Sequence, residues 1–307
     1  MKRNNLKGSA ILCLAALIWG LAFVAQSDAA AHIPPFAFNC LRSFLGAAIL
    51  LIILWIKCLI TKEKFIPENK ENRRITLIGG LICGVLLTIS VNFQQAGLTV
   101  YPEGVAASAR GGFLTAIYVV LVPVVALFFK KKASPIIWGG VAVALIGTYF
   151  LCMSEGFSGI YLGDILMLCC AFCFTFHIIT VDSIGDRVDG VRLSFMQFMV
   201  CGILSLILSL IFEKGGFRVE NILAAAPQIA YLGIMSSGVA YTLQIIGQRY
   251  AEPAVASISM SLESVFAALG GWIIAGDIMS GREFLGCALV FAAIIIAQLP
   301  EIIKKKA

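Results

Sequence analysis

The amino-acid sequence predicts an all-α polytopic membrane protein with ten transmembrane helices, arranged as two inverted five-helix repeats with both termini in the cytoplasm. Three observations lead to this fold class. The 307 residues are 60% hydrophobic and 13% charged, whereas an ordinary soluble domain has about 25% charged residues. Ten long apolar stretches follow one another with short connections. The first five stretches also resemble the second five.

Each apolar stretch is long enough to cross the bilayer as a helix, which takes about 20 residues. The stretches cover roughly 8–27, 35–56, 75–98, 103–129, 134–153, 162–181, 191–212, 227–248, 253–276 and 282–300. They show no alternation of apolar and polar residues, and they exceed the roughly 9–11 residues of a transmembrane strand. The connections between them are too short to hold a soluble domain.

The two halves of the chain match with a constant offset. Gly8, Trp19 and Arg42 have counterparts at Gly163, Phe174 and Gln197, each 155 residues further along. We expect a first repeat at 1–153, a second repeat at 162–300 and a basic cytoplasmic tail at 301–307. Because each repeat has an odd number of helices, the second must enter the membrane from the opposite side. Inverted pairs of this kind are common in secondary transporters.

The basic residues predict the orientation of the chain. With the N-terminus inside, eighteen Lys and Arg residues lie on the cytoplasmic side and three lie outside, as the positive-inside rule requires of a cytoplasmic-membrane protein. The net charge of +6 is therefore topological, and we expect no nucleic-acid partner. The N-terminus also fits a signal peptide, but its apolar stretch has a repeat mate in mid-chain, so we expect it to be retained.

Glu263 is the strongest functional candidate among the intramembrane residues. It lies about ten residues into the ninth stretch, near the midplane at about 1.5 Å per residue. A charge at that depth costs at least about 2.5–3.5 kcal/mol and is a functional hypothesis by default. A membrane carboxylic acid can also carry a proton, so protons are candidate coupling ions. A fixed ion pair is the structural alternative.

Arg42 and Arg110 are two further charges within apolar stretches. A buried guanidinium stays charged and needs a carboxylate, a carbonyl or water. We expect one of them to pair with Glu263 and the other to be free to hold a substrate carboxylate. Structural pairing is an equal alternative for each.

Polar side chains also share faces of stretches that correspond in the two repeats. Thr88, Asn92 and Gln95 lie on one face of the third stretch, and Tyr241, Gln244 and Gln248 lie on one face of the eighth. Matching polar faces favour a central cavity, with interhelical hydrogen bonding as the alternative. The candidate substrate-binding or coupling residues are Trp19, Arg42, Asn92, Gln95, Arg110, Tyr118, His177, Tyr241, Gln244 and Glu263. His177 also fits simple hydrogen-bonded packing.

No cofactor or metal site is expected. The ten cysteines are scattered, and Cys170 with Cys173 gives a CxxC spacing within an apolar stretch, where packing residues are the simpler interpretation. Gly80 and Gly84 form a GxxxG pair, which indicates close helix packing within the chain or, as the alternative, a homodimer.

Four segments give the chain a family resemblance. They are Ala16-Leu17-Ile18-Trp19-Gly20, Leu41-Arg42-Ser43-Phe44, the stretch from Phe113 to Pro123, and Ser261-Leu262-Glu263-Ser264-Val265-Phe266-Ala267-Ala268-Leu269. They resemble the drug/metabolite transporter superfamily, specifically ten-helix transporters with two EamA-type domains. Ser264 replaces the usual proline, which puts a kink beside Glu263 in doubt. The resemblance implies export of small metabolites, amino-acid-like compounds or drugs across the cytoplasmic membrane by alternating access.

Two other functions compete with a secondary transporter that binds a small molecule between the repeats. A membrane-embedded enzyme would need a motif such as HExxH, which is missing from the sequence. A passive channel would need a filter motif or oligomeric symmetry. We therefore expect a transporter and not an enzyme.

Overall fold

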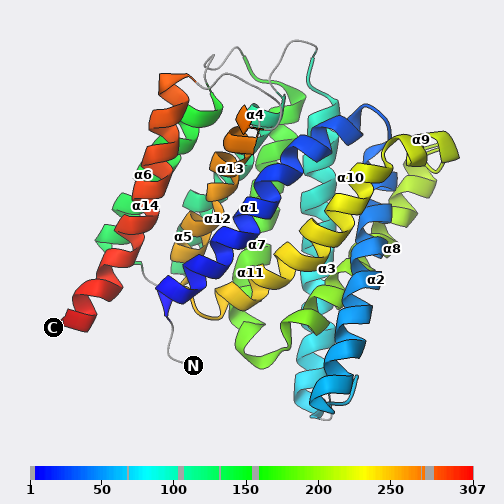
Figure 1. The fold of residues 1–307 in the computed structure, drawn as a ribbon, viewed down its shortest axis with the longest axis horizontal. Helices are drawn as coiled ribbons and strands as arrows, with labels where there is room; N and C mark the ends of the chain where they lie inside the picture. The colour runs from blue at the N-terminus through cyan, green and yellow to red at the C-terminus, as the bar shows by residue number, and fades with distance from the viewer. Residues whose placement is uncertain are drawn as a thin grey trace.

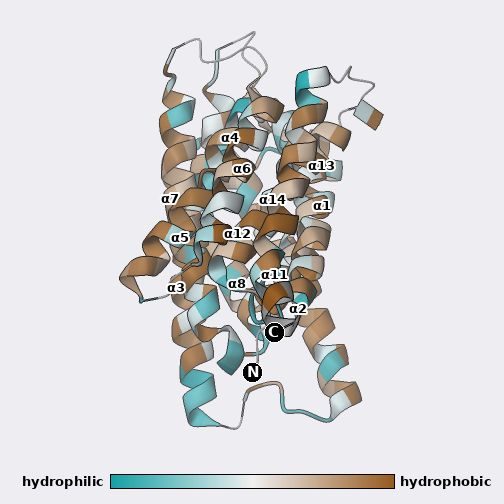
Figure 2. Cartoon of the chain, turned by 90° about the vertical axis from the view of Figure 1, so that its left-hand side faces the viewer, coloured by the Kyte–Doolittle hydropathy of each residue, from teal (hydrophilic) through white to brown (hydrophobic). Residues whose placement is uncertain are grey.

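The described residues fold into an all-helical bundle, which confirms the predicted all-α class. The computed structural model describes residues 4–67, 69–102, 107–130, 133–153, 159–270, 272–273 and 280–306. In this part of the chain, ten helical segments are long and apolar enough to span a membrane. The beginning of α1 and the end of α14 lie at the same end of the bundle (Figure 1). Figure 2 shows mainly hydrophobic helices, with hydrophilic residues gathered near that end.

The first half contributes six helices to five spans. They are α1 (Asn5–Ala30), α2 (Pro35–Thr61), α3 (Lys70–Thr99), α4 (Ala107–Ala116), α5 (Tyr118–Phe128) and α6 (Pro135–Cys152). The second half contains α7 (Leu162–Ile184), η1 (Gly185–Arg187), α8 (Gly190–Phe212), α9 (Val219–Ala224), α10 (Ala226–Tyr231), η2 (Leu232–Ala240), α11 (Tyr241–Gln248), α12 (Pro253–Met260), α13 (Leu262–Gly270) and α14 (Gly281–Lys306).

Local sequence signals explain where several helices begin. Pro35 and Pro253 occupy the first position of α2 and α12, where the missing N–H has no intrahelical partner to lose. The side chain of Asn69 accepts from the backbone N–H groups of Glu71 and Asn72, and Asp189 caps α8 in the same way. Each cap satisfies donors that the first helical turn leaves free.

Three spans that the sequence predicts as continuous helices are interrupted. The fourth span breaks at Ile117, between α4 and α5, and α5 continues through Pro123. The eighth span contains the π-helical segment η2 between two α-helices. The ninth breaks at Ser261, although serine stands at position 264 in place of the family's usual proline. Serine hydroxyls bonded to carbonyls of the preceding turn bend helices, and Ser257, Ser259 and Ser261 all make such bonds.

Each helix contact between the two halves has a counterpart in which the corresponding helices of the opposite halves meet. α1 packs on the eighth and ninth spans, and α7 packs on the third and fourth. α2 packs on α8, and α6 packs on α14. Hydrogen bonds follow the same rule: Gln95 Nε2 donates to the carbonyl of Gln26 in α1, and Gln248 Nε2 donates to the carbonyl of Ile178 in α7. This pairing agrees with a twofold relation between the halves; their opposite orientation in the membrane stays a prediction.

Glycines permit the closest helix approaches. Gly80 and Gly84 of α3 face Met196 and Val200 of α8, where an added Cβ would lie 2.5 Å from each neighbouring Cβ. The GxxxG pair therefore packs within the chain, where small residues bring helices together in lipid.

Candidate functional site

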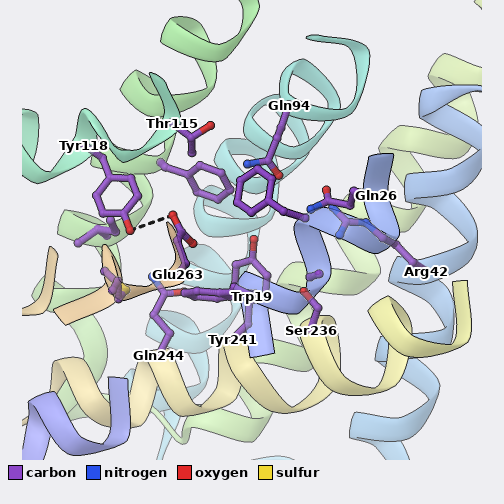
Figure 3. A pocket seen from close by; sticks show the side chains of 15 residues that line it. Trp19, Gln26, Arg42, Gln94, Thr115, Tyr118, Ser236, Tyr241, Gln244 and Glu263 are labelled. Carbon is purple, nitrogen blue, oxygen red and sulfur yellow. Dashed lines mark hydrogen bonds between the residues drawn. The ribbon is translucent and has the colours of Figure 1, made fainter. Parts of the chain in front are cut away.

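A cavity lies among helices of both halves (Figure 3). It is lined by Trp19, Ala22, Phe23, Gln26, Arg42, Gln94, Thr115, Tyr118, Phe174, Ile178, Ser236, Tyr241, Gln244, Met260 and Glu263. The cavity volume is about 50 Å³. In this conformation the cavity has room for a few waters.

Glu263 reaches the cavity from the first turn of α13, directly after the break at Ser261. Glu263 is 6% exposed, and Tyr118 Oη donates a hydrogen bond to Glu263 Oε1 over 3.2 Å. Gly20 lets α1 pass close by, because a Cβ there would lie 2.7 Å from the carbonyl oxygen of Glu263. The break, the small residue and the tyrosine together position one carboxyl group at the cavity wall.

Arg42 lines the same cavity from α2 and is 4% exposed. Its Nε donates to Asn39 Oδ1 over 2.7 Å, and its guanidinium carbon lies 5.7 Å from the ring centre of Phe38. The expected pairing of Glu263 with one of the two arginines is wrong in this conformation: among the described residues, no carboxylate pairs with Arg42. Figure 3 shows Arg42 and Glu263 well apart across the cavity.

Arg110 lies outside the cavity lining, in an ion pair with Asp164 of α7. Nε and a terminal nitrogen of Arg110 contact the two carboxylate oxygens at 2.5 and 2.7 Å, and Tyr101 Oη donates to the same carboxylate over 2.9 Å. The Arg110 guanidinium also lies 4.8 Å from the ring centre of Tyr161. Asp164, which carried no signal in the sequence reading, therefore takes the partner role we expected of Glu263.

Aromatic side chains form much of the cavity wall. The rings of Trp19 and Tyr241 meet edge to face with centres 4.9 Å apart, and Phe198 packs on Tyr241 from behind at 5.1 Å. Phe174, the repeat counterpart of Trp19, lines the cavity as well. Such rings offer an apolar surface for the uncharged part of a ligand.

Six of the ten candidate residues line the cavity, and four do not. Besides Arg110, these are Asn92, Gln95 and His177. Asn92 and Gln95 bond to neighbouring helices, and His177 Nε2 lies 3.0 Å from Gln197 Oε1. These three residues are buried and form interhelical hydrogen bonds, which was the alternative to a role in the cavity.

Gln26, Gln94 and Ser236 line the cavity but were missed. Gln94 had a signal, since it adjoins Gln95, but one residue turns a helical side chain by about 100° and thus onto another face. As for metals, the described residues contain no cluster of three His, Cys, Asp or Glu side chains able to hold an ion.

The model of the EamA-like transporter family matches residues 6–153 and 161–298. The chain belongs to the EamA-like transporter family. An uncharacterized transporter of Archaeoglobus fulgidus is 30% identical over 94% of this chain and 84% of its own length. The uncharacterized transporter YoaV of Bacillus subtilis is 23% identical, over 91% and 92%, and the uncharacterized inner membrane transporter YedA of Escherichia coli is 24% identical, over 92% and 88%.

A solved structure shares the fold of this EamA-family chain. It covers 95% of the chain and 96% of its own length with a TM-score of 0.73 at 20% sequence identity, a likeness that shows the fold alone. The family, the relatives and the ten apolar helices together identify a multi-pass cell membrane transporter.

Proposed function

We propose that this EamA-family protein is a secondary transporter that exports a small zwitterionic metabolite by alternating access. One observation carries the proposal. Arg42 and Glu263 carry opposite charges and line the same cavity, and neither pairs with an opposite charge among the described residues.

A substrate that carries both charges offsets the cost of burying the two side chains. Each charge at membrane depth costs at least about 2.5–3.5 kcal/mol. A substrate carboxylate accepts charge-assisted hydrogen bonds from the Arg42 guanidinium, which is suited to planar anions, and a substrate ammonium group donates to Glu263. The rings of Trp19, Phe174 and Tyr241 then pack on the apolar part of the ligand.

The way the halves pack supports alternating access. Each major contact between the halves has a counterpart between the corresponding helices of the opposite halves. For example, α1 packs on the eighth span and α7 packs on the third. When two inverted halves adopt two conformations, exchanging those conformations opens a central site to the opposite side. The exchanged contacts, together with the positive-inside count, support two inverted five-helix repeats with both termini in the cytoplasm.

The export direction is inferred from the family resemblance, and the coupling ion from the chemistry of Glu263. A proton on Glu263 removes the negative charge, so the carboxyl group no longer attracts a substrate ammonium group. Exchange of a proton for the substrate at this residue therefore links transport to the proton gradient.

Counterflow in proteoliposomes tests the proposal. Vesicles preloaded with unlabelled leucine, a zwitterion with an apolar side chain, are expected to accumulate external labelled leucine faster than empty vesicles. A pore would show no such stimulation. Glu263→Gln is expected to abolish the pH dependence of exchange while the protein stays folded, whereas Glu220→Gln, on the exposed helix α9, is expected to behave as the wild type. Unchanged pH dependence in Glu263→Gln would remove this residue from the mechanism.

A further inference from the structure

The two intramembrane arginines have different kinds of partner. Arg110 bonds to the carboxylate of Asp164, which neutralises its charge, and it lies outside the cavity lining. Arg42 bonds through Nε to the amide oxygen of Asn39, which carries no charge, and it lines the cavity. The partner of Arg42 thus orients the guanidinium and leaves its positive charge uncompensated.

The orientation of the Asn39 amide follows from its neighbours. Arginine Nε can only donate, so the atom facing it is Oδ1, and the carbonyl oxygen of Val91 can only accept, so the atom facing it is Nδ2. Asn39 Nδ2 donates to Val91 O over 3.0 Å and to Asn92 Oδ1 over 2.8 Å. Both sides of the amide are therefore used, and Asn39 is fully buried.

The network continues from Asn39 into two further helices. Asn92 Nδ2 donates to the carbonyl of Thr88 over 2.8 Å and to Ser205 Oγ of α8 over 3.0 Å. Asn39 is thereby tied to α3 directly and to α8 through Asn92. A buried network in which each amide has several partners is rigid, so the position of the Arg42 Nε is fixed from three helices.

We propose that Asn39 determines the charge selectivity of the cavity, by positioning Arg42 to receive a substrate carboxylate without neutralising it. This assignment rests on the proposed function, and it concerns a residue that does not itself line the cavity. An aspartate of the same shape at position 39 loses the bonds to Val91 O and Asn92 Oδ1, but it places a carboxylate against the guanidinium, whose positive charge favours the ionised form. The cavity then keeps only the negative charge of Glu263, and its selectivity shifts from zwitterions toward simple cations.

Three probes of similar shape measure this selectivity. Leucine carries both charges, 3-methylbutylamine lacks the carboxylate, and 4-methylpentanoate lacks the ammonium group. Binding is measured by thermal stabilisation of the full-length protein in nanodiscs, and transport by competition with leucine counterflow. The wild type is expected to prefer leucine over both analogues. In Asn39→Asp the ratio of the affinity for leucine to the affinity for the amine is expected to fall at least tenfold, so that the amine competes at least as well as leucine.

Control variants separate selectivity from damage to the fold. Asn221→Asp makes the same chemical change in α9, away from the cavity, and is expected to keep the wild-type preference. Asn39→Ala leaves Arg42 charged but unpositioned, and is expected to weaken leucine and 4-methylpentanoate binding while the amine is unaffected. Because Asn39→Asp should gain binding of the amine relative to leucine, an unfolded variant cannot imitate the result.

The outcomes also separate this assignment from the proposed function. If the wild type shows no preference among the three probes, the zwitterionic substrate class fails, and the role of Asn39 fails with it. If the wild type prefers leucine and Asn39→Asp keeps that preference, the assignment of Asn39 is wrong and the proposed function stands.

Discussion

Removal of the Asp164 carboxylate is expected to be among the most destabilising single changes in the bundle. The carboxylate accepts two hydrogen bonds from Arg110, one from Tyr101 Oη and one from the backbone N–H of Tyr161. The side chains of Arg110 and Asp164 are 5% and 6% exposed, so Asp164→Ala removes a carboxylate that contacts a nearly buried guanidinium. Breaking one side of such a pair costs about 3–5 kcal/mol.

The magnitude is checked with a double-mutant cycle on the free energy of unfolding, measured by denaturant titration in mixed micelles. Asp164→Ala is expected to lose about 3–5 kcal/mol. The double variant Arg110→Met with Asp164→Ala is expected to recover part of this loss, because no uncompensated charge remains. Glu220→Ala on the exposed helix α9 is the control. If Asp164→Ala unfolds within about 0.5 kcal/mol of the wild type, an ordinary surface effect, the reasoning about the ion pair is refuted.

Three further predictions use the same unfolding assay. Gly20→Ala is expected to destabilise by about 1–3 kcal/mol through overpacking, since its Cβ would lie 2.6 Å from Phe266 Cβ, whereas Gly139→Ala, with open space around its Cβ, is expected to be neutral or stabilising. Glu213→Gln is expected to cost about 0.5–2 kcal/mol, because its carboxylate accepts from two backbone N–H groups at the start of α2; equal stability would contradict this capping role. Burial alone would raise the pKa of Asp189, but hydrogen bonds from Lys57 and from the backbone of its own helix outweigh burial and lower the pKa. The contribution of this carboxylate to stability is therefore complete above the unfolded pKa of about 3.9. It is lost as the pH falls through the lower pKa of the folded protein. Asp189→Asn should accordingly flatten the acid limb of the stability profile, and an unchanged acid limb would exclude this carboxylate as its source.

The number and type of spans could be predicted from the sequence, because hydrocarbon demands long apolar helices whatever the tertiary contacts are. The interruptions within spans could not. The length and apolar composition of 227–248 predict one α-helix, yet the π-helical segment η2 separates α10 from α11. Such a change depends on local packing against α2, where Gly46 lies so close that an added Cβ would be 2.6 Å from Ser237 Cβ.

Intramembrane charge identified candidate residues, but it could not identify their partners. Arg42 and Arg110 look alike in the sequence, since each is a single arginine in an apolar stretch. What distinguishes them is a contact with α7 for Arg110 and a contact within α2 for Arg42. Asp164 stands in the first turn of α7, where its carboxylate accepts from the Tyr161 N–H and also binds the arginine.

The repeat offset places polar contacts at equivalent positions while leaving their chemistry free. Ser9 and Asp164 are 155 residues apart, and each is the acceptor where the first helix of one half meets the other half. Ser9 Oγ accepts from Gln298 Nε2 and lies 2.7 Å from Ser259 Oγ, whereas Asp164 accepts from Arg110. The contact that Ser9 gives α1 is therefore made by neutral hydrogen bonds of about 0.5–1.5 kcal/mol each, and the contact that Asp164 gives α7 is made by charged ones of about 1.5–3 kcal/mol. Equivalent contacts of α1 and α7 can thus differ in strength, and this difference lies in a few side chains rather than in the fold.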